Sequence, residues 1–295
     1  MSFKSGFVSI LGRPNVGKST LLNRIIGEKI AIVSPRPQTT RTRIMGVLTD
    51  DDSQVVFLDT PGVHTPRNKL GEYMVNSAFD ANSESDIVLF LTDKLVDNTE
   101  YLARISPNSK VFLIINKIDE HPKEEILPII EGYSKLQIAG RTVFADIFPI
   151  SAKTGDGVDH LLSSIRQNLP DGPKYFPDDT LTDQPERVII AEIIREKCLR
   201  LLGDEVPFGI AVEIEEMKRD DKKGIINIRA AIYCEKNSHK AIIIGKNGTM
   251  LKEIGSRARA SVEKFFGEKV FLQTWVKVQD NWRNSRTSLK NFGYE

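Results

Sequence analysis

The sequence is poor in cysteine and contains no long apolar run. Its 295 residues include two cysteines, Cys198 and Cys234, and no pattern of metal ligands surrounds either of them. We therefore expect buried thiols in a reducing cytoplasm, and neither a disulfide nor a metal site there. No stretch reaches the roughly 18 apolar residues of a membrane-spanning helix, and residues 1–6 lack the apolar segment of a secretory signal. With 40% hydrophobic residues, the chain is expected to be a soluble globular protein.

Positive charge is concentrated near the C-terminus. The net charge is +1, yet residues 236–295 contain 12 Lys and Arg against 5 Asp and Glu. This asymmetry suggests that the C-terminal part binds a polyanion. On charge alone, an equally weighted alternative is that the positive residues form a helix face exposed to solvent. The length suits two domains.

The motif G-x-x-x-x-G-K-[ST] dominates the N-terminal half. It lies between an apolar strand predicted over 7–11 and an amphipathic helix predicted over 20–26. Converging backbone N–H groups and the start of a helix form a phosphate site, in which Lys18 would reach the β and γ phosphates and Ser19 would bind Mg²⁺. The nucleotide-binding candidates here are Gly12, Arg13, Pro14, Asn15, Val16, Gly17, Lys18, Ser19 and Thr20.

Short apolar runs follow this motif and alternate with segments of helical period. The runs are 55–58, 87–91, 111–115 and 147–150, and the helical segments include 126–136 and 158–169. This pattern predicts an α/β fold with a doubly wound parallel sheet. Ligands of such sheets bind at the carboxyl ends of the strands, where the polar motifs of this chain fall.

Three polar motifs supply the remaining candidates. Asp59 could hold Mg²⁺ through water, and Gly62 would let its backbone approach a γ-phosphate. Asp119 can accept both the ring N–H and the exocyclic amine of guanine, which predicts GTP as the nucleotide. A metabolic kinase is disfavoured, because these motifs recognise guanine and do not bind a phosphoacceptor substrate. The candidates are Asp59, Thr60, Pro61 and Gly62, then Asn116, Lys117 and Asp119, and finally Ser151, Ala152 and Lys153.

These motifs together resemble the translation-factor-related GTPases. The resemblance places a Mg²⁺-contacting threonine in residues 37–41, for which we favour Thr40, with Thr39 as the alternative. The neighbouring Arg36, Arg41 and Arg43 are interpreted as RNA or protein contacts. Small Ras-like GTPases have a water-orienting Gln where this chain has Val63, so we expect slow intrinsic hydrolysis. His64 could act as a general base in hydrolysis or could only contact solvent, and we favour the solvent contact.

A Pro-rich linker over 170–185 separates the two halves. The second half predicts a helix over 186–202, strands over 208–217 and 225–233, and a further helix that leads into a G-x-x-G loop at 245–248. A helix over 249–266 and a strand over 270–278 are predicted to follow. This order resembles the type II KH RNA-binding domain, whose G-x-x-G loop clamps about four nucleotides. The RNA-binding candidates are Gly245, Lys246, Asn247, Gly248, Arg257 and Arg259.

The chain resembles the Era family of bacterial GTPases from end to end. We therefore expect a GTP-binding domain over 1–170, a linker over 171–185, a KH domain over 186–280 and a tail over 281–295. The resemblance implies a GTP- and GDP-binding enzyme of small ribosomal subunit assembly that binds the 3′ end of 16S rRNA, with peripheral membrane association. We expect a monomer that does not bind DNA. The alternative is a GTPase switch whose C-terminal domain binds a protein.

The resemblance also suggests a cation at Asn15. Related GTPases with the same loop hold potassium there, so we add K⁺ as a second hypothesis. Mg²⁺ is the expected cofactor. An Asn15 that only braces the loop through a backbone hydrogen bond is an equal alternative.

Overall fold

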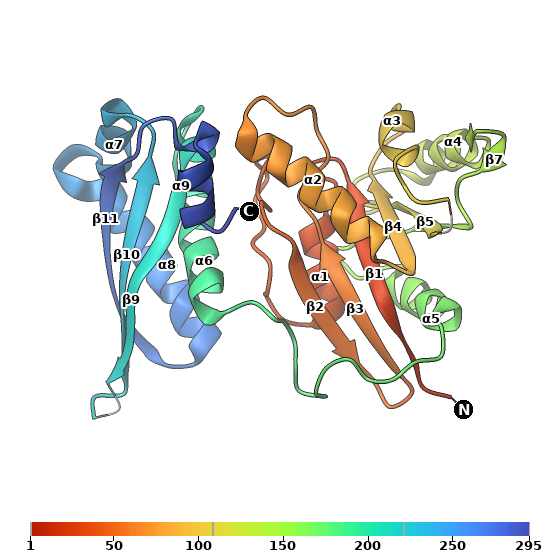
Figure 1. Ribbon diagram of the computed structural model, residues 1–295, viewed down its shortest axis with the longest axis horizontal. Helices are drawn as coiled ribbons and strands as arrows, with labels where there is room; N and C mark the ends of the chain where they lie inside the picture. The colour runs from red at the N-terminus through yellow and green to blue at the C-terminus, as the bar shows by residue number, and fades with distance from the viewer. Residues whose placement is uncertain (1, 108, 221, 295) are drawn as a thin grey trace. The chain divides into compact units, whose positions relative to one another are not determined.

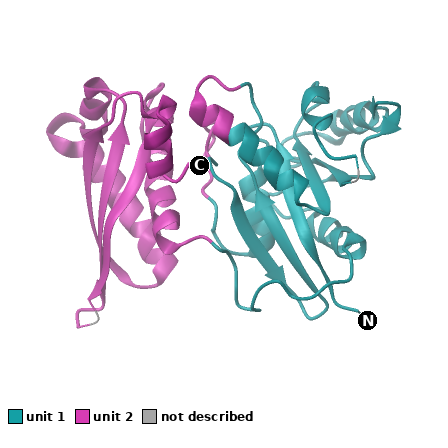
Figure 2. Ribbon diagram, in the orientation of Figure 1, with its two compact units in different colours: residues 1–31, 40–65, 74–183 teal, residues 32–39, 66–73, 184–295 magenta. Residues whose placement is uncertain are grey.

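The computed structural model describes residues 2–107, 109–220 and 222–294. The chain forms two compact units (Figure 2). Unit 1 contains residues 1–31, 40–65 and 74–183, and unit 2 contains residues 32–39, 66–73 and 184–295. Two short segments of the N-terminal half therefore belong to unit 2.

Unit 1 is built on one mixed sheet of six strands in the order β2-β3-β1-β4-β5-β8 (Figure 1). Strand β2 is antiparallel to β3, and the other neighbouring strands are parallel. The strands are β1 (Lys4–Gly12), β2 (Ile44–Thr49), β3 (Ser53–Asp59), β4 (Ile87–Thr92), β5 (Lys110–Ile115) and β8 (Asp146–Pro149). The predicted α/β fold is confirmed, but the antiparallel edge strand β2 was not predicted.

Gly46 gives a physical reason why β2 escaped the pattern. A Cβ atom at Gly46 would lie 2.8 Å from a methyl carbon of Leu22 and 2.9 Å from one of Ile30. The strand therefore needs a glycine where helix α1 packs closely, and this glycine interrupts the β-branched run by which strands are found.

Helices cover both faces of this sheet. Helices α1 (Lys18–Ile26) and α5 (Val158–Asn168) pack on one face, together with the inward side chains of β1, β3 and β5. Helices α2 (Lys69–Ser83), α3 (Thr99–Leu102) and α4 (Lys123–Ser134) pack on the other face, and a small hairpin, β6 (Gln137–Ile138) and β7 (Arg141–Thr142), follows α4. Both helical layers bury the strands. The phosphate loop follows β1 and precedes α1, and both of these elements belong to the core.

The predicted linker runs along the edge of unit 1. The Gln54 side chain accepts the backbone N–H groups of Tyr175 and Phe176 at 2.7 and 3.0 Å. The ring of Tyr175 packs on Phe7 at 5.0 Å, and the carbonyl of Leu181 accepts the N–H of Val47. Aromatic residues of this segment thus pack on unit 1.

Unit 2 contains a three-stranded sheet in the order β11-β10-β9. Strand β10 (Ile225–Cys234) is antiparallel to β9 (Ala211–Asp220) and parallel to β11 (Lys269–Val278). Helices α6 (Glu186–Leu201), α7 (Asn237–Ile244) and α8 (Thr249–Phe266) share one core with the sheet. This is the predicted KH element order. A 3₁₀ turn, η1 (Val206–Gly209), precedes β9, so the strand begins three residues later than predicted.

The last residues fold back onto unit 2. The indole N–H of the buried Trp282 donates to the carbonyl of Gly209 at 2.9 Å, and the Trp282 ring contacts Phe292 and Tyr294. These residues lie in or beside η3 (Trp282–Asn284) and α9 (Arg286–Asn291). Both cysteines are buried and free, and burial raises the pKa of Cys198 to about 12. The predicted buried thiols are confirmed.

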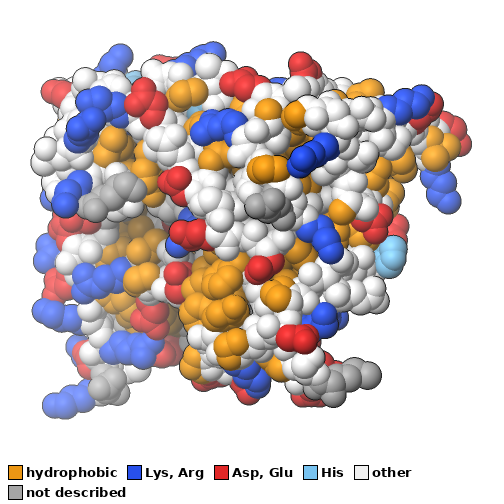
Figure 3. Space-filling view, turned by 45° about the vertical axis from the view of Figure 1, so that its right-hand side comes forward, with side chains coloured by type: hydrophobic (Ala, Val, Ile, Leu, Met, Phe, Trp, Pro, Cys, Tyr) orange, Lys and Arg blue, Asp and Glu red, His pale blue; other side chains and the backbone are white. Residues whose placement is uncertain are grey.

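On the face drawn in Figure 3, Lys and Arg side chains are interspersed with Asp and Glu. Within the described ranges, no helix combines the length and the apolar composition needed to cross a membrane.

Candidate nucleotide and RNA sites

The phosphate loop connects β1 directly to α1. Gly17, at φ 103°, is the last residue before the helix, and a Cβ there would lie 2.1 Å from Nδ2 of Asn116. Only glycine fits this close approach. Asn15 is exposed in the left-handed region at φ 65°, Pro14 is half-buried, and Thr20 lies in the first turn of α1.

Lys18 is buried under the loop. Its Nζ donates to the carbonyls of Gly12 and Arg13, both at 3.0 Å. Burial lowers the pKa of Lys18 to about 8, and the charge of Asp59 opposes this shift. Burial likewise raises the pKa of Asp59 to about 6, against the effects of Lys18, Ser19 and Thr40. Both charges are thus desolvated, as expected at a site that binds an ionic ligand.

Three oxygen-bearing side chains converge beside Lys18. Ser19 Oγ donates to Asp59 Oδ2 at 2.6 Å and lies 2.8 Å from Thr40 Oγ1. The other oxygen, Asp59 Oδ1, is buried and has no hydrogen-bond partner among the described residues. Two hydroxyls and a carboxylate are hard oxygen ligands, and the orphaned oxygen leaves room for a positive charge. The donor set therefore fits Mg²⁺.

The two candidate threonines have different surroundings. Thr40 is buried in this oxygen cluster, whereas the Thr39 hydroxyl donates to the carbonyl of Arg36 at 2.6 Å. The structure thus brings Thr40 to Ser19 and Asp59, and turns Thr39 away.

The loop after β3 lies against the phosphate loop. The backbone of Gly62 approaches Pro14 closely, and the Val63 N–H donates to the carbonyl of Gly12 at 3.1 Å. The Thr60 hydroxyl instead donates to the carbonyl of Ile10 inside the core, and Pro61 is buried. Val63 is 1% exposed, so this position cannot orient water.

Of the two ring nitrogens of His64, Nδ1 forms a hydrogen bond, whereas Nε2 has no hydrogen-bond partner among the described residues. Its Nδ1 lies 2.8 Å from the carbonyl of Gly62, which can only accept a hydrogen bond, so Nδ1 carries the proton. Nε2 is buried without a hydrogen-bond partner in the described part of the chain. In the neutral ring this nitrogen is an acceptor.

Asn116 joins two loops of the site. Its Nδ2 donates to the carbonyl of Val16 at 2.7 Å, and its Oδ1 accepts the N–H of Ala152 at 2.9 Å. The side chain is thus a brace between the phosphate loop and residues 151–153. The motif predicted that Asn116 belongs to the site, but not these partners, because both bonds span long sequence separations.

Asp119 is held ready to accept hydrogen bonds. The Ser151 hydroxyl donates to Asp119 Oδ1 at 2.6 Å and holds the pKa of Asp119 below its usual range. The Lys153 ammonium lies 3.6 Å from Oδ2. Asp119, Ser151, Ala152 and Lys153 are therefore together, as the sequence predicted for reading guanine.

Two basic candidates point elsewhere. Lys117 pairs with Asp93 at 2.7 Å. The Arg13 guanidinium donates to Asn98 Oδ1 at 2.8 Å and to the carbonyl of Asp97 at 2.6 Å. The Arg13 side chain is thus held by the segment before α3 and is not folded over the loop.

Each of the three arginines near Thr40 is either buried or bonded to another residue of the chain. Arg41 is 1% exposed, so its interpretation as an RNA or protein contact is wrong. Arg36 donates to the carbonyl of Leu202 at 2.6 Å, and the exposed Arg43 pairs with Glu84 at 3.0 Å.

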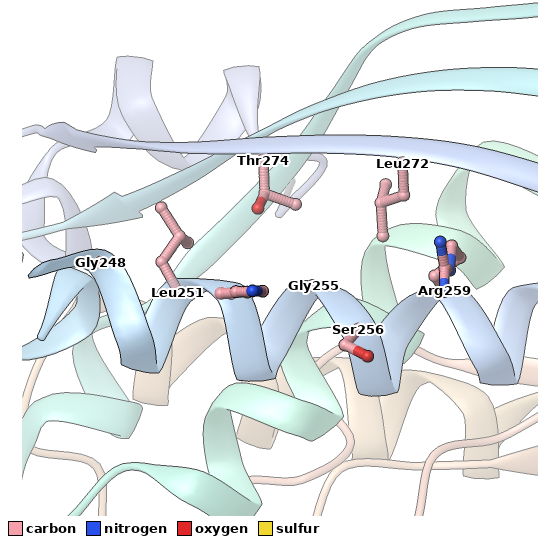
Figure 4. Close-up of a pocket in the computed structure, with 8 residues that line it drawn as sticks. Gly248, Leu251, Gly255, Ser256, Arg259, Leu272 and Thr274 are labelled. Atoms are coloured by element: carbon pink, nitrogen blue, oxygen red, sulfur yellow. The ribbon is translucent and has the colours of Figure 1, made fainter.

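The G-x-x-G loop borders a groove between α8 and β11. The groove has a volume of about 450 Å³, and Figure 4 shows Leu272 and Thr274 of β11 facing the helix that carries Leu251 and Arg259. Its lining comprises Gly248, Leu251, Lys252, Gly255, Ser256, Arg259, Leu272 and Thr274. The apolar and hydroxyl lining was not predicted, since it depends on the facing of two elements distant in sequence.

The loop geometry requires glycine at its start. Gly245 has φ 72°, and a Cβ there would lie 2.9 Å from the backbone nitrogen of Met250. Lys246 and Asn247 are exposed. Arg259 lines the groove, whereas Arg257 pairs with Glu253 at 2.6 Å and is not part of the lining.

Two family models match separate parts of the chain. Residues 7–117 match the family described as 50S ribosome-binding GTPase, and residues 205–283 match the KH domain family.

Relatives cover nearly the whole chain. It is 51% identical over 303 aligned positions to the GTPase Era of Clostridioides difficile (strain 630), covering 99% of both chains. It is 52% identical to the GTPase Era of Ruminiclostridium cellulolyticum (strain ATCC 35319 / DSM 5812 / JCM 6584 / H10), covering 100% of this chain and 99% of the relative.

Two solved structures share the fold over 99% of both chains at 41% identity. One is an Era in complex with MgGDPNP and nucleotides 1506–1542 of 16S ribosomal RNA, with a TM-score of 0.93. The other is a variant of Aquifex aeolicus Era bound to GDP and AlF4-, with a TM-score of 0.91.

Proposed function

Because the chain belongs to the Era family of GTPases and hydrolyses GTP, we propose that it binds the 3′ region of 16S rRNA and assists small-subunit assembly. The observation that carries this proposal is the solved Era complex, which holds both Mg²⁺ with a GTP analogue and 16S rRNA. Two features of this chain support it: the oxygen cluster beside the phosphate loop and the groove beside the G-x-x-G loop.

GTP binding is assigned to the loops at the carboxyl ends of the strands. Backbone N–H groups of residues 12–20 surround the phosphates, with Lys18 as the cation. Asp119 accepts from the base, and Asn116 holds the two loops at the correct separation. The proposed Mg²⁺ ligands are Ser19, Thr40 and Asp59, the last directly or through water. The ion would neutralise charge on the β and γ phosphates.

Hydrolysis must proceed without the glutamine of Ras-like GTPases. Val63 is apolar and buried, so the chain has no water-orienting side chain at that position. We infer that a potassium ion bound by Asn15 supplies charge beside the phosphates. Turnover should then be faster in KCl than in NaCl at equal ionic strength, and Asn15→Ala should remove the difference. Equal rates in both salts for the unaltered protein would leave the missing charge to a partner.

RNA binding is assigned to unit 2. The positive φ of Gly245 and the exposure of Lys246 and Asn247 allow the loop backbone to approach phosphates, and the groove beyond Gly248 can hold bases. Arg259 lines this groove and is the better placed of the two arginines predicted for RNA.

Salt dependence distinguishes RNA from the alternative, a protein partner for unit 2. Affinity for a short single-stranded RNA with the sequence of the 16S rRNA 3′ end should fall steeply between 50 and 200 mM salt, because each phosphate contact releases counterions. A scrambled RNA of equal length is the matched control. Weak, salt-independent binding of both RNAs would favour the protein partner.

The finer expectations on location are also proposals. We infer a cytoplasmic monomer that does not bind DNA and that associates peripherally with the membrane. Cell fractionation and sedimentation with anionic vesicles test the membrane contact, sedimentation velocity tests the monomer, and a duplex DNA of equal length tests the exclusion of DNA.

A further inference from the structure

Arg24 of α1 contacts the loop that follows β8. Its Nε donates to the carbonyl of Ala152 at 3.4 Å, and its guanidinium also donates to the carbonyl of Lys153. The side chain continues past these two residues, since its Nε lies 3.9 Å from the position that a Cβ atom at Gly155 would take. One arginine thus lies along residues 152–155.

Helix α1 gives the Arg24 side chain a fixed origin. Four apolar side chains of this helix are buried in the core, namely Leu21, Leu22, Ile25 and Ile26. The exposed Arg24 therefore extends from a helix whose opposite side is anchored. The same helix begins at Lys18, at the phosphate loop. Arg24 thus connects the helix of the phosphate site to the loop of the base site.

The oxygen O6 of guanine needs a donor that Asp119 does not supply. A carboxylate can accept from the ring N–H and from the exocyclic amine of the base, but it cannot donate. The adjacent loop offers backbone N–H groups. The N–H of Ser151 donates to a carbonyl within the same loop, and that of Ala152 donates to Asn116 Oδ1. The N–H of Lys153 has no such partner among the described residues, so it is the donor that remains for O6.

The two bonds from Arg24 orient this donor. The carbonyl of Ala152 and the N–H of Lys153 belong to one planar trans peptide and point in opposite directions. Because Arg24 donates to this carbonyl, the N–H of Lys153 points away from Arg24. The second bond, to the carbonyl of Lys153, orients the next peptide plane. One guanidinium therefore holds both peptide planes that flank the Cα atom of Lys153.

We propose that Arg24 is a positioning residue for guanine recognition, which acts by holding the backbone of Ala152 and Lys153 so that the N–H of Lys153 meets O6. The proposal rests on the proposed function, in which residues 151–153 line the guanine site. Asp119 keeps its own support without Arg24, because the Ser151 hydroxyl donates to it. Loss of Arg24 therefore affects the contact to O6 and spares the contacts to the ring N–H and the amine.

Two variants and three nucleotides test this role. Arg24→Met removes both donated bonds and keeps an unbranched stem, and Arg24→Lys keeps the charge but cannot span two carbonyls. Arg141→Met, at an exposed position of β7, is the matched control. Each protein is titrated, with Mg²⁺, with GDP, with IDP, which lacks only the exocyclic amine, and with 6-thio-GDP, in which sulfur replaces O6. Thermal midpoints are recorded in parallel.

We expect both Arg24 variants to bind GDP and IDP about fivefold less tightly, which is the contribution of one hydrogen bond. Affinity for 6-thio-GDP should fall less, because sulfur is a weak acceptor. The ratio of GDP affinity to 6-thio-GDP affinity should therefore decrease in both variants and stay unchanged in Arg141→Met.

Three results would overturn one of the two proposals. A ratio equal to that of the unaltered protein, with or without a lower thermal midpoint, would reduce Arg24 to a structural role. A smaller loss for IDP than for GDP would assign the effect to Asp119 and would also overturn the positioning of Lys153. Absence of GDP binding in the unaltered protein would instead overturn the proposed function.

Discussion

Asn116→Ala removes a side chain that joins two loops of the nucleotide site. Asn116 is 3% exposed, and it satisfies the carbonyl of Val16 and the N–H of Ala152. Its loss leaves both backbone groups without this partner. An unsatisfied buried polar group costs about 1–3 kcal/mol, so the free energy of unfolding should fall by about 2–6 kcal/mol.

The same substitution should weaken GTP and GDP binding by one common factor. The Asn116 side chain connects the phosphate loop to residues 151–153. GTP and GDP both contact these two loops, so we expect its loss to affect both nucleotides equally. Isothermal titration with GDP and a GTP analogue measures the factor, and urea unfolding measures the stability. Asn116→Asp should retain the bond from Ala152 and lose the one to Val16, because a carboxylate cannot donate.

Gln167→Ala, at an exposed position on α5, serves as the control. A stability change below about 0.5 kcal/mol in Asn116→Ala, with both nucleotide affinities intact, is typical of an ordinary surface site and would refute the brace. A loss confined to GTP would also refute it, since the brace does not contact the γ-phosphate region.

Three further outcomes follow from the two sites. Asp119→Asn should weaken GTP binding and strengthen XTP binding, and unchanged GTP affinity would remove Asp119 from the site. Ser151→Ala should raise the pKa of Asp119, so that GTP affinity is lost at a higher pH on acidification than in the unaltered protein; identical pH profiles would contradict this. Gly245→Asp should abolish RNA binding with GTP binding intact, and Lys246→Glu, which creates no clash, should weaken RNA binding in the same direction.

The parts of the site that could be predicted are those in which chemistry dictates the residue type. Phosphate requires glycine, lysine and backbone N–H groups at the start of a helix, and guanine requires a carboxylate. The roles of residues 12–19 and Asp119 could therefore be predicted from the sequence alone. The strand ends supplied the spatial order, because parallel strands bring their following loops to one edge.

The parts that could not be predicted depend on contacts between distant residues. In strand β2, Gly46 accommodates α1 and interrupts the apolar sequence pattern by which a strand is predicted. Arg36 and Arg41 looked like surface cations by sequence, yet one binds a carbonyl of the chain and the other is buried. Local sequence gives the charge of an arginine but not the hydrogen-bond acceptor that it meets. That acceptor determines whether the arginine has a structural role or is available to contact RNA.

The nucleotide site buries two charges that its ligands can neutralise. Asp59 Oδ1 has no hydrogen-bond partner among the described residues, and burial shifts the pKa values of Lys18 and Asp59 towards their neutral forms. The fold thus holds two desolvated charges whose natural partners are a phosphate and a cation. Mg²⁺ and nucleotide satisfy both, and a ligand that binds only the folded state stabilises it in proportion to the logarithm of its concentration. The burial of these two charges therefore makes folding and nucleotide binding mutually reinforcing.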